Sequence, residues 1–197
     1  MPPPTRRCVL AVMLDHDKLG YDDADTVHGT MPRKTGTPIG DLGALKPRLT
    51  CGANIWAVDD IPYQDVIWTM DALVKAGLVD IEIGDPADPA LRKPKPPTSP
   101  NAWHIEGDTR GKLDREELAK LPVIVITKTD VSIAGKPIGK AKDDFAAALA
   151  KAMPAKPPDY PTAILQADAS LPFKAIRTAI AGAHAAGYDN ILFAVKK

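Results

Sequence analysis

An internal repeat constrains this chain more than any other feature of its sequence. Residues 61–83 and 171–193 align without a gap at a constant offset of 110 positions (171 minus 61). Identical residues in the alignment include these pairs: Pro62 and Pro172, Gly77 and Gly187. A repeat must be considered before any local pattern, because each copy is expected to form the same unit. The sequence therefore predicts two tandem copies of one fold.

The pattern inside each copy predicts a helix followed by a strand. Val66, Met70 and Leu73 recur at helical spacing and form one apolar stripe. A proline suits the first helical position, since the N–H that it lacks has no partner there. A glycine suits the left-handed residue that follows a last helical turn. A short apolar run comes after each glycine, and we expect it to be a strand.

The remaining segments predict an α+β fold built from two tandem repeats, each a small mixed sheet with two helices on one face. Copy two adds a hairpin with Gly135 at its turn and a helix over Lys142–Met153. Copy one has only a weak helix pattern at 39–49, which holds two glycines and a proline. The strands expected before the repeated helices are 8–14, 53–58, 122–127 and 162–167.

The repeats define the expected domains. Copy one covers 6–85 and copy two covers 121–197. Residues 86–120 form a proline-rich linker without apolar periodicity, and 113–121, at its boundary with copy two, predicts a short helix.

Composition excludes some function classes. Lysine plus arginine and aspartate plus glutamate are 25 each, so bulk charge gives no reason to expect nucleic acid as a partner. The sequence contains no run of about 18 apolar residues, so it predicts no membrane-spanning helix. The apolar run near the N-terminus is too short for a secretory signal. We therefore expect a cytosolic protein or a soluble part of a larger one.

The second copy resembles a known family in its signature "ADASLPFKAIRTAIAGAHAAGYDNILFAV" and its hairpin "VIVITKTDVSIAGKPIG". Both are similar to the periplasmic domain of the ExbD/TolR family of biopolymer transport subunits. The similarity of copy two covers 121–197, and that of copy one is best over 53–85. Two departures are present: the family's N-terminal membrane helix with its aspartate is missing, and two domains stand where the family usually has one.

The resemblance implies a non-enzymatic role in an ion-driven inner-membrane energy-transduction system. The implied partners are an ExbB/TolQ-like channel subunit and a TonB/TolA-like protein, and no cofactor is implied. The chain would be periplasmic and anchored in the inner membrane as part of a parent protein, or cytoplasmic if it is complete. Two copies in one chain suggest a covalent pseudo-dimer, because family members pair through this domain.

A partner-binding site is expected at the last strand, which is apolar at every position. As an edge strand it would offer unpaired backbone groups to a partner strand or to another protomer. The expected strand residues are Ile191, Leu192, Phe193, Ala194 and Val195. The runs "CVLAVML" and "PVIVIT" lack alternation, which predicts burial on both sheet faces.

The two cysteines leave two readings open. Cys8 precedes the first strand and Cys51 precedes the next strand of copy one, so parallel pairing would place both at one end of the sheet. A disulfide is one reading, because an oxidising periplasm permits it. Two reduced, buried thiols are the other.

An alternative function is a small α/β enzyme or a ligand-binding module with its site in the loop Asp15–Gly43. The loop lacks a complete calcium motif, because Leu19 stands where an oxygen ligand is needed and Thr26 stands where a bidentate glutamate is needed. "GKPIGKA" lacks the spacing and the serine or threonine of a phosphate loop. No nucleophile or zinc motif occurs, so the sequence predicts neither catalytic nor metal-binding residues.

Overall fold

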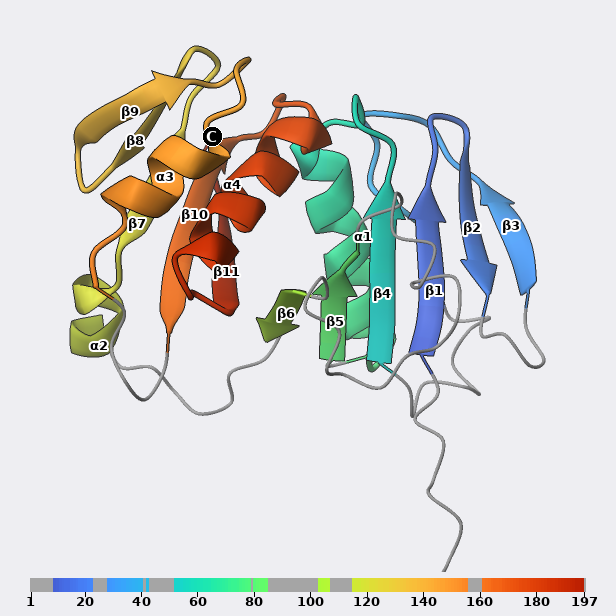
Figure 1. Cartoon of the computed structure of the whole chain (residues 1–197). Coiled ribbons are helices and arrows are strands. Elements are labelled where there is room, and N and C mark those ends of the chain that lie inside the picture. Colours follow the sequence, from blue (N-terminus) through green and yellow to red (C-terminus); the bar gives the residue numbers. More distant parts are fainter. Residues whose placement is uncertain are drawn as a thin grey trace, which may run out of the picture.

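The computed structural model shows an α+β protein with mixed sheets and a few helices (Figure 1). The structure describes these residues: 9–22, 28–40, 42, 52–78, 80–84, 103–106, 115–155 and 161–196. We call 9–84 the first half and 121–196 the second half.

The elements alternate in a similar way in the two halves. The strands are β1 (Val9–Leu14), β2 (Lys18–Asp22), β3 (His28–Pro32), β4 (Gly52–Ala57), β5 (Asp80–Ile83), β6 (Trp103–Glu106), β7 (Val123–Ile126), β8 (Asp130–Ile133), β9 (Lys136–Lys140), β10 (Thr162–Asp168) and β11 (Asn190–Lys196). The helices are α1 (Tyr63–Lys75), α2 (Arg115–Lys120), α3 (Ala146–Ala152) and α4 (Phe173–Ala185).

Each half pairs its strands in the same order. In the first half the order is β3-β2-β1-β4-β5, with β1, β4 and β5 parallel and the other pairs antiparallel. In the second half it is β9-β8-β7-β10-β11, with β7, β10 and β11 parallel and the other pairs antiparallel. The hairpin predicted at Gly135 is confirmed, and Ala134 and Gly135 form its turn with φ of 47° and 77°.

Strand β6 joins the two halves and was not predicted. It pairs antiparallel with β5 over four residue pairs, and parallel with β11 only at Asn190↔His104. The interval 86–120 had been assigned to an extended linker, but it contains β6 as well as the predicted short helix, α2. The alternation of apolar and polar residues in "WHIE" was the signal for this strand.

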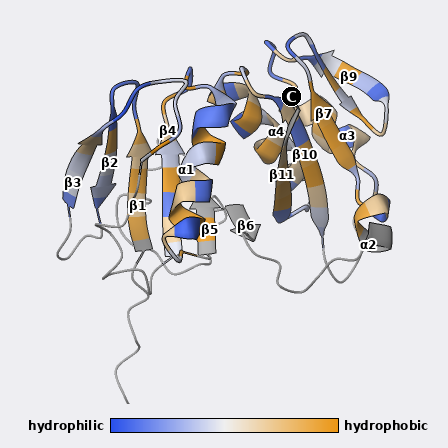
Figure 2. Cartoon of the chain, turned by 180° about the vertical axis from the view of Figure 1, so that it is seen from behind, coloured by the Kyte–Doolittle hydropathy of each residue, from blue (hydrophilic) through white to orange (hydrophobic). Residues whose placement is uncertain are grey.

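The helices cover opposite faces of the joined sheets. Helices α3 and α4 lie in front of the second-half strands in Figure 1, whereas α1 lies behind β4 and β5. Figure 2 shows the reverse side, with α1 in front. Most of the weak helix pattern at 39–49 lies outside the described residues. Within the described parts of the chain, no helix is long and apolar enough to span a membrane.

Both repeated helices begin one residue later than the sequence predicted. Pro62 and Pro172 are not the first helical residues; they precede the helices with extended ψ values of 137° and 142°. The N–H of the residue after each proline is in the first helical turn, so it has no acceptor in its own helix and can donate elsewhere in the chain.

The prediction that the first strands are buried on both faces is wrong. Leu10, Val12 and Leu14 are buried, but Met13 is 43% exposed, and β7 alternates between buried and partly buried residues. The described helices cover only one face of each half-sheet. Every second side chain of a strand therefore points to the face that these helices do not cover. The buried residues of both halves form one apolar cluster.

Candidate functional site

The two halves meet where each repeated helix begins, at residues 59–64 and 169–174, which we call the seam. The Tyr63 N–H donates to the Leu171 carbonyl at 2.8 Å, and the Phe173 N–H donates to the Ile61 carbonyl at 2.8 Å. These reciprocal bonds place Pro62 and Pro172 opposite one another in an antiparallel bridge.

A second reciprocal pair of bonds extends the seam. The Gln64 N–H donates to the Ala169 carbonyl at 3.1 Å, and the Lys174 N–H donates to the Asp59 carbonyl at 2.9 Å. Helix starts leave backbone N–H groups without intrahelical partners, and neither α1 nor α4 has a side-chain N-cap bond. Each half therefore caps the helix of the other half.

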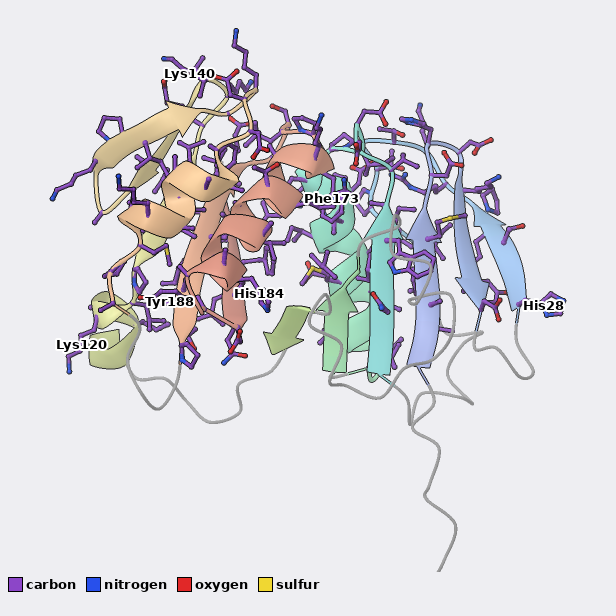
Figure 3. All side chains as sticks on the ribbon, viewed as in Figure 1. His28, Lys120, Lys140, Phe173, His184 and Tyr188 are labelled. Atoms are coloured by element: carbon purple, nitrogen blue, oxygen red, sulfur yellow. The ribbon has the colours of Figure 1, made fainter. Side chains whose placement is uncertain are left out.

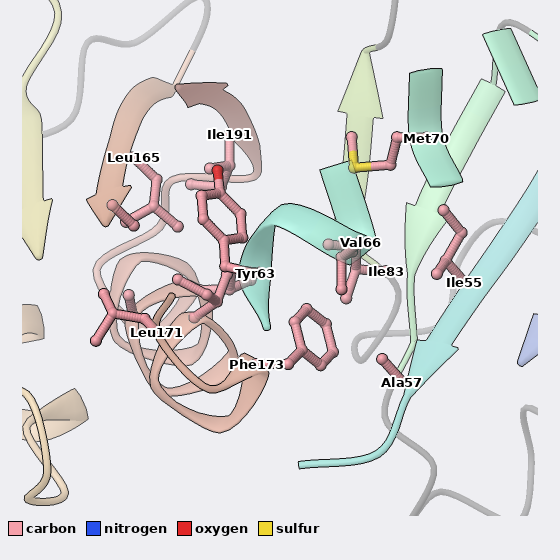
Figure 4. Close-up of a cluster of buried hydrophobic side chains, with 14 of the residues drawn as sticks. Ile55, Ala57, Tyr63, Val66, Met70, Ile83, Leu165, Leu171, Phe173 and Ile191 are labelled. Atoms are coloured by element: carbon pink, nitrogen blue, oxygen red, sulfur yellow. The ribbon is translucent and has the colours of Figure 1, made fainter. Parts of the chain in front are cut away.

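Apolar side chains fill the seam beneath these bonds. Tyr63 and Phe173 are both fully buried, and the Tyr63 ring lies 6.2 Å from the Phe193 ring, centre to centre, at 46°. Figure 4 shows Tyr63 between Leu165, Leu171 and Ile191, and Phe173 beside Val66 and Ile83. Each aromatic side chain thus reaches into the core of the opposite half.

The Tyr63 hydroxyl is the chemical exception in this cluster. It is buried and has no hydrogen-bond partner, and burial raises the pKa of Tyr63. Phe173, at the equivalent position, has no hydroxyl. The Tyr188 hydroxyl, by contrast, donates to the Pro154 carbonyl at 3.0 Å.

The ion pair between Arg177 and Asp59 crosses the seam and breaks its symmetry. Arg177 Nη2 lies 2.8 Å from Asp59 Oδ1. The residues at the equivalent positions, 110 apart, are Ile67 and Ala169. One side of the seam therefore has a charged contact where the other side has apolar residues.

A buried ion pair connects the described part of the loop Asp15–Gly43 to α1. The Arg33 side chain is 4% exposed and contacts the Asp65 carboxylate, which is fully buried in the first turn of α1. Asp65 also accepts from the Gly36 N–H at 3.0 and 3.2 Å to its two oxygens. Position 175, its equivalent in α4, is alanine.

These contacts hold the loop against the β1–β2 turn and α1. Arg33 donates to the Asp15 carbonyl, and the Thr35 hydroxyl donates to the His16 carbonyl at 3.0 Å. Leu19 is buried in β2. The Arg33–Asp65 pair was not predicted; an aspartate three positions after a helix-starting proline was the signal that could have indicated a polar contact there.

The predicted partner strand, β11, lies between β10 and β6 in the sheet order. Residues 190–196 pair with β10, but β6 pairs only at Asn190. The Asn190 N–H donates to the Pro161 carbonyl on the β10 side. Because successive N–H groups alternate along a parallel strand, those of Ile191 and Phe193 point toward β6. Among the five predicted residues, Ile191 is buried and Leu192, Phe193 and Ala194 are partly buried.

Both cysteines, Cys8 and Cys51, lie outside the described residues. The residues that follow them, Val9 and Gly52, are register partners in the parallel pair β1–β4. The parallel pairing on which the disulfide prediction depends is therefore present.

The other polar groups of interest lie apart from the seam. "GKPIGKA" lies on and beside the edge strand β9, where Lys140 Nζ contacts Asp130 Oδ1 at 2.6 Å. This hydrogen bond lowers the pKa of Asp130 and raises that of Lys140. Figure 3 shows His28, Lys140 and His184 well separated. Among the described residues, no three His, Cys, Asp or Glu side chains gather as a metal site would need.

Comparison of the chain with protein-family models, with curated proteins and with solved structures gave no match.

Proposed function

We propose that this chain is a non-enzymatic protein-interaction module made of two copies of an ExbD/TolR-like periplasmic domain, joined as a covalent pseudo-dimer. The observation that carries the proposal is the seam, where four backbone bonds relate the halves reciprocally at the same offset of 110 that the sequence repeat has. The shared strand order of the halves supports it.

The proposed role is energy transduction at an inner membrane. The module would act in the periplasm, held there by an anchor in a parent protein, and would bind an ExbB/TolQ-like channel subunit and a TonB/TolA-like protein. The apolar seam supports a scaffold, and the buried Arg33–Asp65 pair beside it holds the loop against α1.

A copurification experiment tests this role. The chain, fused to an Asp-bearing membrane helix, is expressed with an ExbB/TolQ-like channel subunit and purified through the channel. Val195→Pro removes an outward N–H of β11, whereas the control, Ala194→Pro, removes an N–H directed at β10. We expect copurification of the unmodified chain and its loss in Val195→Pro. A chain that never copurifies with the channel would contradict the proposal.

The alternative, an enzyme or ligand-binding module, places its site in Asp15–Gly43. A ligand that binds the folded state raises its melting temperature. Divalent metals and nucleotides are added to the unmodified chain and to Asp65→Asn. A shift in melting temperature that the unmodified chain shows and Asp65→Asn lacks would favour this alternative over the interaction module.

A further inference from the structure

Strand β6 is one strand placed between two similar edges. It pairs with β5 through all four of its residues and touches β11 at one. The β5 residues 80–83 and the β11 residues 190–193 are equivalent at the offset of 110. One edge is therefore covered by β6, and its counterpart is covered only where β11 begins.

The two edges present their backbone N–H groups toward β6 at equivalent residues. The Gly84 N–H donates to the Ile55 carbonyl on the β4 side, so the N–H groups of Ile81 and Ile83 point toward β6. The corresponding residues on β11 are Ile191 and Phe193, whose N–H groups also point toward β6. The β5 edge with β6 on it thus shows which kind of strand such an edge accepts.

The connection of β6 to β5 is long for an antiparallel pair. Neighbouring antiparallel strands are commonly joined by two to five residues, whereas residues 85–102, 18 in number, separate β5 from β6. The entropy cost of closing a loop rises with its length. The equilibrium constant for pairing β6 with β5 is therefore about tenfold smaller than that for a strand in a tight hairpin. An extended segment of another chain can compete with it.

We propose that β6 is an exchangeable strand, and that the β5 edge at Asp80–Ile83 accepts an extended antiparallel segment of a partner protein in its place. Trp103 and Ile105 stand in register with Ile83 and Ile81, so the partner segment carries large apolar residues two positions apart, with polar residues between and after them. The inference rests on the proposed interaction role and names the strand that a partner displaces.

A peptide with the sequence of residues 101–108, NAWHIEGD, is the probe. It is labelled with a fluorophore, and its binding to the full chain is measured by anisotropy. In Ile105→Pro the chain's own β6 loses a ladder donor and leaves the edge. We expect Ile105→Pro to bind the peptide at least about tenfold more tightly than the unmodified chain does. A peptide with proline in place of its isoleucine is the control and should not bind.

A disulfide lock identifies the binding site. Glu82 and His104 are register partners, and because their neighbours Ile81 and Ile105 form the hydrogen-bonded pair, they lie at the closer, non-bonded position. Glu82→Cys with His104→Cys, in a chain with Cys8→Ser and Cys51→Ser, fixes β6 on β5 when oxidised. We expect the oxidised chain not to bind the peptide and the reduced chain to bind it.

Equal peptide binding by the unmodified chain, Ile105→Pro and the locked chain would overturn the inference. If Ile105→Pro does not fold, hydrogen exchange of the unmodified chain tests whether β6 leaves the β5 edge. An exchangeable β6 predicts that the amides of Ile81 and Ile83 exchange at least about tenfold faster than those of Asn54 and Trp56 in β4, which face β1, and equal protection would exclude it. Failure of these tests leaves copurification with the channel subunit as a separate test of the proposed function.

Discussion

At the scale of single residues, two tyrosines meet opposite conditions in the same core. Tyr63 is fully buried with an unpartnered hydroxyl, whereas the hydroxyl of Tyr188 donates to Pro154. An unsatisfied buried polar group costs about 1–3 kcal/mol, and a satisfied hydrogen bond contributes about 0.5–1.5 kcal/mol.

Tyr63→Phe is expected to stabilise the protein by about 1 kcal/mol, which corresponds to roughly 2–4 °C in melting temperature. Phe173 at the equivalent position shows that a phenyl ring suits this packing. Tyr188→Phe is the matched control and is expected to destabilise by a similar amount. Calorimetry of both variants decides, and a lower melting temperature for Tyr63→Phe would contradict the assignment of an unsatisfied hydroxyl.

The pKa of Tyr63 gives a prediction at alkaline pH. Burial raises this pKa above the unfolded value of about 10, so the unfolded chain loses the proton first as the pH increases. The free energy of unfolding must therefore fall as the pH rises above about 10. We expect urea denaturation between pH 9 and 11 to show a smaller fall for Tyr63→Phe than for the unmodified chain. Identical slopes would mean that Tyr63 ionises in the folded state as it does in the unfolded one.

At the scale of elements, α3 and α4 approach closely because of one glycine. A Cβ at Gly182 would lie 2.7 Å from the Ala146 carbonyl oxygen and 3.0 Å from Leu149 Cβ. Both neighbours belong to α3, so a side chain at this position must push the helices apart.

Gly182→Ala is therefore expected to lower the free energy of unfolding by about 1–3 kcal/mol, although alanine favours a helix more than glycine does. Gly40→Ala is the control, because a Cβ there meets nothing within 4 Å. Denaturant titration of the two variants tests this, and a stabilised Gly182→Ala would show that α3 can move away without cost.

The sequence predicted most elements because their signals are local. The stripe of Val66, Met70 and Leu73 and the glycine after it identified α1, and the same spacing identified α4. By contrast, α3 begins at Ala146 rather than Lys142, because Asp144 accepts from the Ala146 N–H and residues 140–143 form a turn. The proline positions were wrong by one residue because their role depends on acceptors in the other half of the chain.

At the scale of the whole molecule, the features that the sequence did not predict depend on contacts between residues that are far apart in the chain. The offset of 110 indicated a pseudo-dimer, but it could not show which backbone groups the halves exchange, since hydrogen bonds between loops leave no periodic pattern. The Asp59–Arg177 pair breaks the repeat, so the alignment itself concealed it. Strand β6 was missed because the proline content around it outweighed a four-residue alternation.

The cysteines give a prediction at this scale, because a disulfide would link the residues that immediately precede the parallel strands β1 and β4. Val9 and Gly52 are register partners, and the disulfide reading requires that Cys8 and Cys51 be oxidised together. Thiol titration of protein from an oxidising compartment, unfolded without reductant, measures this directly. We expect no free thiol if the disulfide forms, and two free thiols would establish the reduced reading.

The charged contact on one side of the seam has a consequence for how such a molecule can change. In an assembly of two identical chains, a new residue at an interface appears on both sides at once and must suit both. Here the two sides are encoded separately, so Asp59 can pair with Arg177 while the equivalent positions hold the apolar residues Ile67 and Ala169. Covalent joining therefore lets each half acquire its own features, such as the Arg33–Asp65 pair, and two surfaces of common shape can come to recognise different molecules.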